Sequence, residues 1–316
     1  MMNRAISTLL LQRLVQAGLV AWVVGTLTFI LTRALPGDMA FRIAAGRYGY
    51  EQVNAEAAAA VQAELGLDQS PLIAYFHWLS DLLSLDLGHS LVSGESVVSE
   101  LAHQLGHSLD LALMAMLLAL VIGVPVGILS GLRPNGWVDR LALVSAVALR
   151  SLPPFVIGLL LIMLFAVQLG WLPAAGHGGG SHLWLPAMAL ALGLAAVSAR
   201  VTRHGMARVA GSPYYAFSRT RGLSEGQTLA RHGLRNVAVP VIAYLSVQLV
   251  YLVEGVVVIE SLFAWPGIGH ALVHAVVARD VPMIQGTALV MGLLFVTLNT
   301  LVDLVSLYID PRRRLS

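Results

Sequence analysis

Long apolar stretches alternate with shorter polar ones along the whole chain. A helix needs roughly 20 apolar residues to cross a bilayer core of about 30 Å. Six stretches are about that long or longer: residues 14–32, 109–131, 141–170, 184–201, 237–259 and 287–309. The pattern predicts an all-α, polytopic membrane protein with six transmembrane helices.

The first apolar run is expected to be a retained span and not a cleaved leader. Arg4 and Arg13 precede it, as in a signal peptide, but the run is long for the apolar region of such a peptide. The following "TRALPGD" offers no small-residue cleavage site. We therefore expect an N-terminal segment with the first span (1–33), a periplasmic region (34–108), and a core with the other five spans (109–316).

Composition supports a membrane protein. Hydrophobic residues make up 57% of the 316 residues and charged residues 11%, and the mean hydropathy is +0.78. Soluble domains carry about 25% charged residues. The sequence contains no cysteine, which excludes disulfides and thiolate metal sites.

The basic residues, all of them arginine, predict the orientation, because such residues are retained on the cytoplasmic side. They collect at the two termini and in the second and fourth connections between spans: Arg4, Arg13, Arg133, Arg140, Arg200, Arg203, Arg208, Arg219, Arg221, Arg231, Arg235, Arg312, Arg313 and Arg314. Most of the charged residues in the long region 36–107 are acidic. Both termini are therefore predicted to be cytoplasmic.

The connection between the fourth and fifth spans has a pattern of its own. Helical segments flank Gly222, Ser224 is a suitable N-cap for the second, and Gly222 is expected to need backbone angles that a β-branched residue cannot adopt. This predicts a helix, a glycine turn and a helix under the membrane. Two interpretations remain: a basic loop that fixes topology or contacts anionic lipid, and a docking surface.

Motifs in a fixed order carry a family resemblance. They are "LPGD" (35–38), "LGLDQSPLIAYFHWL" (65–79), "DLGHSL" (86–91), "LGWLPAAG" (169–176), "RTRGLSEGQTLARHGLRNVAVP" (219–240), "ESLFAWPGIG" (260–269), "ARDVPMIQG" (278–286) and "VDLVSLYIDPR" (302–312). Over nearly its whole length the chain resembles the inner-membrane permease subunits of bacterial ABC importers, in the dipeptide, oligopeptide and nickel branch. The resemblance implies the type I permease fold.

The resemblance also implies partners. A coupling loop (residues 202–236) would dock on an ABC ATPase through Tyr214, Phe217, Arg219, Arg221, Gly222, Leu223, Glu225, Arg231 and Arg235. The assembly would comprise a second permease subunit, two ATPases that bind ATP and Mg, and a periplasmic or lipoprotein substrate-binding protein. No cofactor on this chain and no nucleic acid are implied. Because residues 213–217 depart from the family pattern, Tyr215 and Phe217 are expected to form an aromatic anchor instead.

Missing motifs narrow the function class. Without lysine the chain has no GxxxxGK[ST] phosphate loop, so energy from ATP must come through another chain. It also has no HExxH, no GxSxG and no cysteine nucleophile, so we expect a transporter subunit and not an enzyme. A membrane scaffold or receptor that does not transport remains the alternative of another class.

Two charges interrupt predicted spans. Arg150 lies in the third and Glu254 in the fifth, where Gln248 and Tyr251 are close in sequence. A centred arginine costs roughly 2.5 to 3.5 kcal/mol on insertion scales, so a partner or water is expected. The four residues are candidates for the translocation path, and a structural ion pair between Arg150 and Glu254 is the alternative.

The histidines are relevant to whether the transported solute is a metal. His103 and His107 are four apart, as are His270 and His274, so each pair would share a helix face, and the loop "GHGGGSH" adds His177 and His182. They are either candidate metal contacts or ordinary outer-face residues. Di- or oligopeptides are the first expected cargo and nickel or a metal chelate the second, because no motif separates them.

Overall fold

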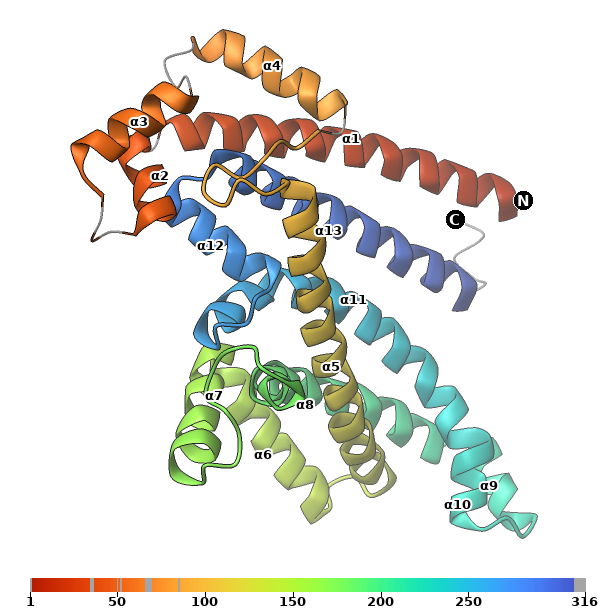
Figure 1. Ribbon diagram of the computed structural model, residues 1–316. Helices are drawn as coiled ribbons and strands as arrows, with labels where there is room; N and C mark the ends of the chain where they lie inside the picture. Colours follow the sequence, from red (N-terminus) through yellow and green to blue (C-terminus); the bar gives the residue numbers. More distant parts are fainter. Residues whose placement is uncertain are drawn as a thin grey trace. The chain divides into compact units, whose positions relative to one another are not determined.

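A computed structural model describes residues 2–34, 37–49, 51, 53–65, 70–84 and 86–309. The described residues are almost entirely helical (Figure 1). The elements are α1 (Met2–Ala34), α2 (Met39–Tyr48), α3 (Ala55–Leu65), α4 (Pro71–Leu83), α5 (Val97–Leu132), α6 (Trp137–Ser151), α7 (Pro154–Leu161), η1 (Ile162–Gln168), η2 (Gly180–Leu183), α8 (Trp184–Ala210), α9 (Pro213–Thr220), α10 (Glu225–Thr228), η3 (Leu229–Gly233), α11 (Leu234–Leu262), α12 (Ile268–Ala278) and α13 (Val281–Ile309). This confirms the all-α prediction.

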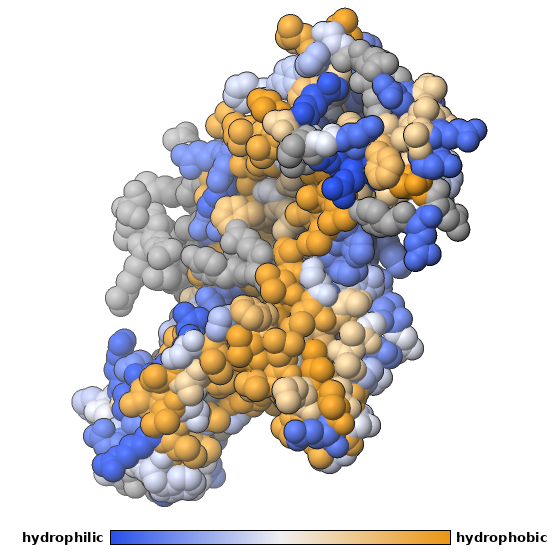
Figure 2. Space-filling model, turned by 90° about the vertical axis from the view of Figure 1, so that its left-hand side faces the viewer, coloured by the Kyte–Doolittle hydropathy of each residue, from blue (hydrophilic) through white to orange (hydrophobic). Residues whose placement is uncertain are grey.

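Several of the predicted spans are long apolar helices. Within the described residues, four helical segments are long and apolar enough to cross a membrane: Ile6–Ala34, Val97–Leu132, Gly180–Ala210 and Val281–Leu304. Exposed apolar side chains cover their outer faces, for example Leu14 (70% exposed) and Val121 (62%), and Figure 2 shows apolar surface over much of the face it views. The chain is therefore a multi-pass membrane protein, and six spans remain a prediction.

The third predicted span, residues 141–170, is broken in the structure. Residues 137–151 and 154–168 form two helical pieces that are bent by 104° at a break. Pro153 and Pro154 occupy the break, and proline removes a backbone donor and disfavours helix at the residue before it. Counted as one bent span, the pair raises the number to five.

The chain divides into two compact units. The first comprises residues 3–108 and 266–297, and the second comprises residues 109–265 and the C-terminal residues from Leu298. Helices α5 and α13 each contribute residues to both units.

In the second unit, α5 packs closely on α8 through a glycine stripe. Gly123, Gly127 and Gly131 are spaced by four, so they share one face of α5. A Cβ added to Gly127 would lie 2.5 Å from the Ala199 carbonyl oxygen. Small residues at this spacing let two helix backbones approach closely within a membrane. The three glycines therefore allow the close contact between α5 and α8.

In the first unit, a buried carboxylate joins two of the sequence motifs. Asp280, which is 3% exposed, accepts hydrogen bonds from the Ser90 hydroxyl, from the Leu91 backbone N–H (3.2 Å) and from the Met283 N–H (3.3 Å). It therefore caps the start of α13 and holds "DLGHSL" against "ARDVPMIQG". Val97, Leu101, Ile268, Ala275, Met283 and Ile284 form the adjoining apolar core.

Candidate coupling surface and translocation residues

The connection between α8 and α11 folds as predicted. Helix α9 ends in a turn where Gly222 has φ of 86°, and α10 follows. Ser224 caps α10 in a reciprocal pair: its hydroxyl accepts from the Gln227 N–H (3.3 Å), and its own N–H donates to Gln227 Oε1 (3.1 Å). The predicted helix, glycine turn, helix and N-cap are confirmed.

Helix α9 exposes two aromatic side chains and buries a third. Tyr214 is 44% exposed and Phe217 is 61% exposed, while Tyr215 is only 4% exposed. Tyr215 packs in a core with Met206 and Val237. The predicted aromatic anchor of Tyr215 with Phe217 is therefore wrong, because residues two apart point to opposite sides of a helix, whereas Tyr214 and Phe217, three apart, share a face.

The other candidate coupling residues extend this surface. Arg221 places its guanidinium over the Phe217 ring, 5.6 Å from the centroid. Glu225 and Arg231 are exposed and Leu223 is half-buried. The side chains of Arg219 and Arg235 lie outside the described residues.

An ion pair that the sequence did not suggest ties α6 to α8. Asp139 is 6% exposed and faces the Arg203 guanidinium, with Nε to Oδ1 at 3.0 Å and Nη2 to Oδ2 at 2.7 Å. The Asn135 N–H also donates to Oδ2 at 2.9 Å. Arg203 was assigned only to a basic loop; the available signal was that Asp139 is the one acid among the arginines of residues 133–140. The pair anchors the end of α8 that leads into α9.

The candidate translocation residues are only partly described. Arg150 lies in the last turn of α6, beside the bend, where a helix C-terminus favours a positive charge. Its side chain is exposed. Gln248 is half-buried on α11, whereas the side chains of Tyr251 and Glu254 lie outside the described residues. The pairing of Arg150 with Glu254 stays a prediction.

The histidine pairs share helix faces as predicted. The Nε2 atoms of His103 and His107 are 3.2 Å apart, and the rings of His270 and His274 are 4.5 Å apart between centroids. Burial, and secondarily the nearby His274, lower the pKa of His270. His177 packs edge-on against the Trp265 ring, 4.9 Å between centroids. No group of three or more metal-binding side chains was found among the described residues, so the pairs form no complete metal cage there.

Comparison with known sequences decides the family. Residues 123–315 match the family described as "Binding-protein-dependent transport system inner membrane component", and residues 6–112 match the N-terminal region of such components. The chain belongs to this family. It is thus an inner-membrane permease of an ABC importer, and such permeases work with ATPase subunits and a binding protein.

Full-length relatives place this permease in the peptide branch. It is 38% identical over 292 residues to the glutathione transport system permease protein GsiC of Pectobacterium atrosepticum, covering 92% of this chain and 94% of that one. It is 36% identical over 293 residues to GsiC of Escherichia coli K12, covering 93% and 94%.

Solved structures share the permease fold. The methionine ABC transporter MetNI, in an inward-facing conformation, matches with a TM-score of 0.54 and 18% identity over 67% of this chain and 96% of that chain. An amino acid ABC transporter with histidines matches with a TM-score of 0.51 and 16% identity, over 66% and 93%. At these identities the likeness concerns the fold alone.

Proposed function

We propose that this permease forms part of the import path for di- or oligopeptides, as one half of a heterodimer with a second permease. Full-length similarity to glutathione permeases is the observation that supports a peptide cargo, because glutathione is a tripeptide. A substrate-binding protein would deliver the peptide, and two ATPases would supply the energy. Both termini would lie in the cytoplasm of a bacterium.

The chain itself would carry out no covalent chemistry. ATP binding would close the ATPase dimer, and the coupling loop would pass this motion to the spans, which would then open outward. The exposed aromatic pair of α9 supports a docking role, since aromatic side chains are enriched among residues that dominate binding energy. The ion pair between Asp139 of α6 and Arg203 of α8 would make α8 and α9 move with α6.

Arg150 would contribute to peptide recognition. A guanidinium binds a carboxylate with two parallel charge-assisted hydrogen bonds, and every linear peptide with a free C-terminus carries one. Its exposure beside the bend between α6 and α7 supports a position on the path. Gln248, Tyr251 and Glu254 on α11 would line the same path.

Nickel or a metal chelate is the second candidate cargo. It is favoured by the two ring nitrogens of His103 and His107, which converge to 3.2 Å on one side of α5. Two imidazoles leave most coordination positions of a metal ion to other ligands. This geometry therefore fits a chelate that brings its own ligands better than a bare ion.

The experiment is uptake by cells that express the permease with its partners. We expect labelled glutathione or a labelled dipeptide to accumulate, and Arg150→Gln to reduce this uptake about tenfold, the value of one charge-assisted contact. Arg140→Gln is the matched control, since Arg140 is also an exposed arginine of α6 but at its other end. Uptake of radioactive nickel without uptake of any peptide would favour the second candidate, and no uptake of either would favour a scaffold.

A further inference from the structure

Helix α4 lies outside the predicted spans, yet it exposes a continuous apolar stripe. Leu72, Phe76, Leu79 and Leu83 are spaced by four, three and four residues, so they share one face of the helix. Leu72 is 69% exposed, Phe76 63% and Leu83 80%, and Leu79 is half-buried. These four residues are called the α4 stripe below. Exposed apolar patches of this kind mark surfaces that bind a partner or a membrane.

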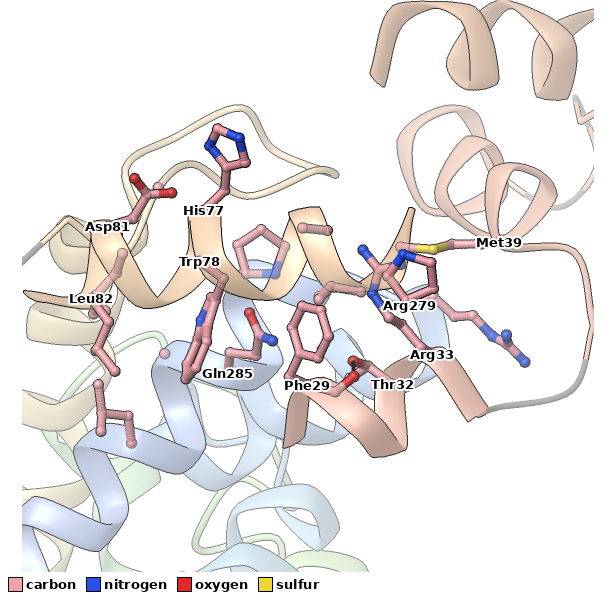
Figure 3. Close-up of a pocket in the computed structure, with 18 of the residues that line it drawn as sticks. Phe29, Thr32, Arg33, Met39, His77, Trp78, Asp81, Leu82, Arg279 and Gln285 are labelled. Carbon is pink, nitrogen blue, oxygen red and sulfur yellow. Dashed lines mark hydrogen bonds between the residues drawn. The ribbon is translucent and has the colours of Figure 1, made fainter. Parts of the chain in front are cut away.

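Two other sides of α4 have different neighbours. Tyr75 and Trp78 face α1, and the Tyr75 hydroxyl is hydrogen-bonded to the Thr26 hydroxyl at 3.0 Å. His77 and Asp81 point away from Trp78 and form a polar side (Figure 3). The α4 stripe is a third side, separate from both.

A glycine of α1 makes the contact between the two helices close. A Cβ added to Gly25 would lie 2.4 Å from the Trp78 ring, so a larger residue there would push the ring away. The Trp78 ring also lies 6.0 Å from the Phe29 ring between centroids. These contacts place α4 beside residues 25–29 of α1.

This contact falls within the apolar length of α1. Residues 14–32 carry no charge, and Arg33 is the first charged residue after them. Thr26 precedes Arg33 by seven residues, which is about 10 Å along a helix that rises about 1.5 Å per residue. Amphipathic helices of the membrane surface bury their apolar face to a depth of about 5 to 10 Å. With α1 across the bilayer, α4 therefore lies at the depth of the leaflet that adjoins the C-terminal end of α1.

The face of α1 that contacts α4 continues as exposed apolar surface. Trp22 and Ile30 lie four residues before and after Thr26, so the three residues share one face of α1. Trp22 is 54% exposed and Ile30 is 55% exposed. Exposed apolar side chains on the outer face of a span contact acyl chains. The acyl chains on this face of α1 therefore adjoin α4.

A cavity behind α4 limits its contacts with protein. The cavity has a volume of about 690 Å³, and residues of α1, α4 and α13 line it, among them Phe29 and Leu82 (Figure 3). Protein thus covers only part of the inner side of α4. Because a short helix depends on packing of its apolar face for stability, α4 needs a further apolar contact.

We propose that α4 is a membrane-surface helix whose stripe inserts among the acyl chains of the leaflet at the C-terminal end of α1. His77 and Asp81 face the headgroups and water, while Tyr75 and Trp78 hold the helix on α1. Tyrosine and tryptophan are enriched at this level of membrane proteins. The bilayer completes the packing of α4, so part of the predicted periplasmic region (34–108) lies in the membrane.

Site-directed spin labelling tests the proposal, because a chain without cysteine accepts a label at one chosen position. Phe76→Cys and Leu83→Cys are labelled in the full chain in phosphatidylcholine nanodiscs. Collisions with oxygen, which concentrates among acyl chains, are compared with collisions with a water-soluble nickel chelate. We expect oxygen to dominate at both positions, as at Leu14→Cys, the lipid-facing control on α1 that is 70% exposed. The nickel chelate should dominate at Asp81→Cys and at Glu56→Cys on α3, whose side chains are exposed.

Three results would overturn the proposal. Dominant collisions with the nickel chelate at Phe76→Cys and Leu83→Cys would place the stripe in water. Few collisions with either reagent would show that protein covers it, for example a second copy of this chain. Loss of the oxygen collisions on assembly with the second permease would assign the stripe to that subunit.

A second measurement tests whether lipid holds α4 in place. Phe76→Ser should speed amide hydrogen exchange across α4 about tenfold in nanodiscs, in keeping with the transfer free energy of one large apolar side chain. Serine and phenylalanine have similar helix propensities, so propensity does not explain such a change. Phe41→Ser, at a phenylalanine of α2 that is 38% exposed, is the matched control and should leave exchange of α4 unchanged. Equal exchange in Phe76→Ser and the wild type would contradict the proposal. Apart from the assembly with the second permease, these measurements need neither partners nor transport, so a negative result leaves the proposed import function standing.

Discussion

The ion pair of Asp139 and Arg203 makes a quantitative prediction. Arg203→Leu removes two charge-assisted hydrogen bonds and leaves Asp139, a residue that is only 6% exposed, with a hydrogen bond from the Asn135 N–H. Breaking a buried pair from one side costs about 3 to 5 kcal/mol. We expect the lower end, about 3 kcal/mol of unfolding free energy, because the Arg203 side chain is itself 21% exposed.

Replacing the acid of the pair should lower the unfolding free energy by a smaller amount. Asp139→Leu leaves the guanidinium, which can turn toward water on its long stem, so we expect a loss of about 2 kcal/mol. The double variant should lose less than the sum, with an interaction energy of about 2 kcal/mol. Arg208→Leu, at an exposed position farther along α8, is the control and should stay within about 0.5 kcal/mol of the wild type.

The assay is equilibrium unfolding with sodium dodecyl sulfate in mixed micelles, followed by circular dichroism. All four proteins of the cycle and the control are measured under one condition. Losses that simply add in the double variant would show that the two side chains do not stabilise each other, and the anchoring role given to the pair would be refuted.

Three further predictions concern other helices. Gly222→Val should leave the permease inserted but abolish co-purification of the ATPases, because valine cannot readily adopt φ of 86°; Gly226→Val, at a position with open space and ordinary backbone, should retain them. Gly127→Leu should prevent stable assembly, seen as aggregation in size-exclusion chromatography, because its Cβ alone would lie 2.5 Å from a backbone oxygen of α8. Arg150→Leu and Glu254→Leu should each reduce assembly and the double variant should recover it; additive losses would show that the two are not partners.

The sequence was sufficient where apolar length or local turn chemistry decides the structure. The helices near residues 14–32, 109–131, 184–201 and 287–309 follow from hydropathy alone. The glycine turn and the Ser224 cap follow from local residue chemistry, because a left-handed turn and a helix start each need particular residues.

Features that depend on tertiary packing were missed. The burial of Tyr215 required knowing which face of α9 meets α8 and α11, although its spacing from Phe217 already argued against a shared anchor. Pro153 and Pro154 were the sequence signal for the bend. It was not used, because the residues on both sides form one long apolar run. Asp280 meets Ser90 across 190 residues, and no local pattern predicts such a contact.

The measurement that tests the account most directly is ATP-driven uptake in proteoliposomes. The permease, a second permease, the ATPases and the binding protein are reconstituted together, and labelled glutathione or dipeptide inside the vesicles is measured with and without ATP. The account predicts accumulation that requires ATP and this chain, and that is lost in Gly222→Val while the protein remains inserted. Equal accumulation without this chain, or full ATP-driven uptake by Gly222→Val, would contradict it.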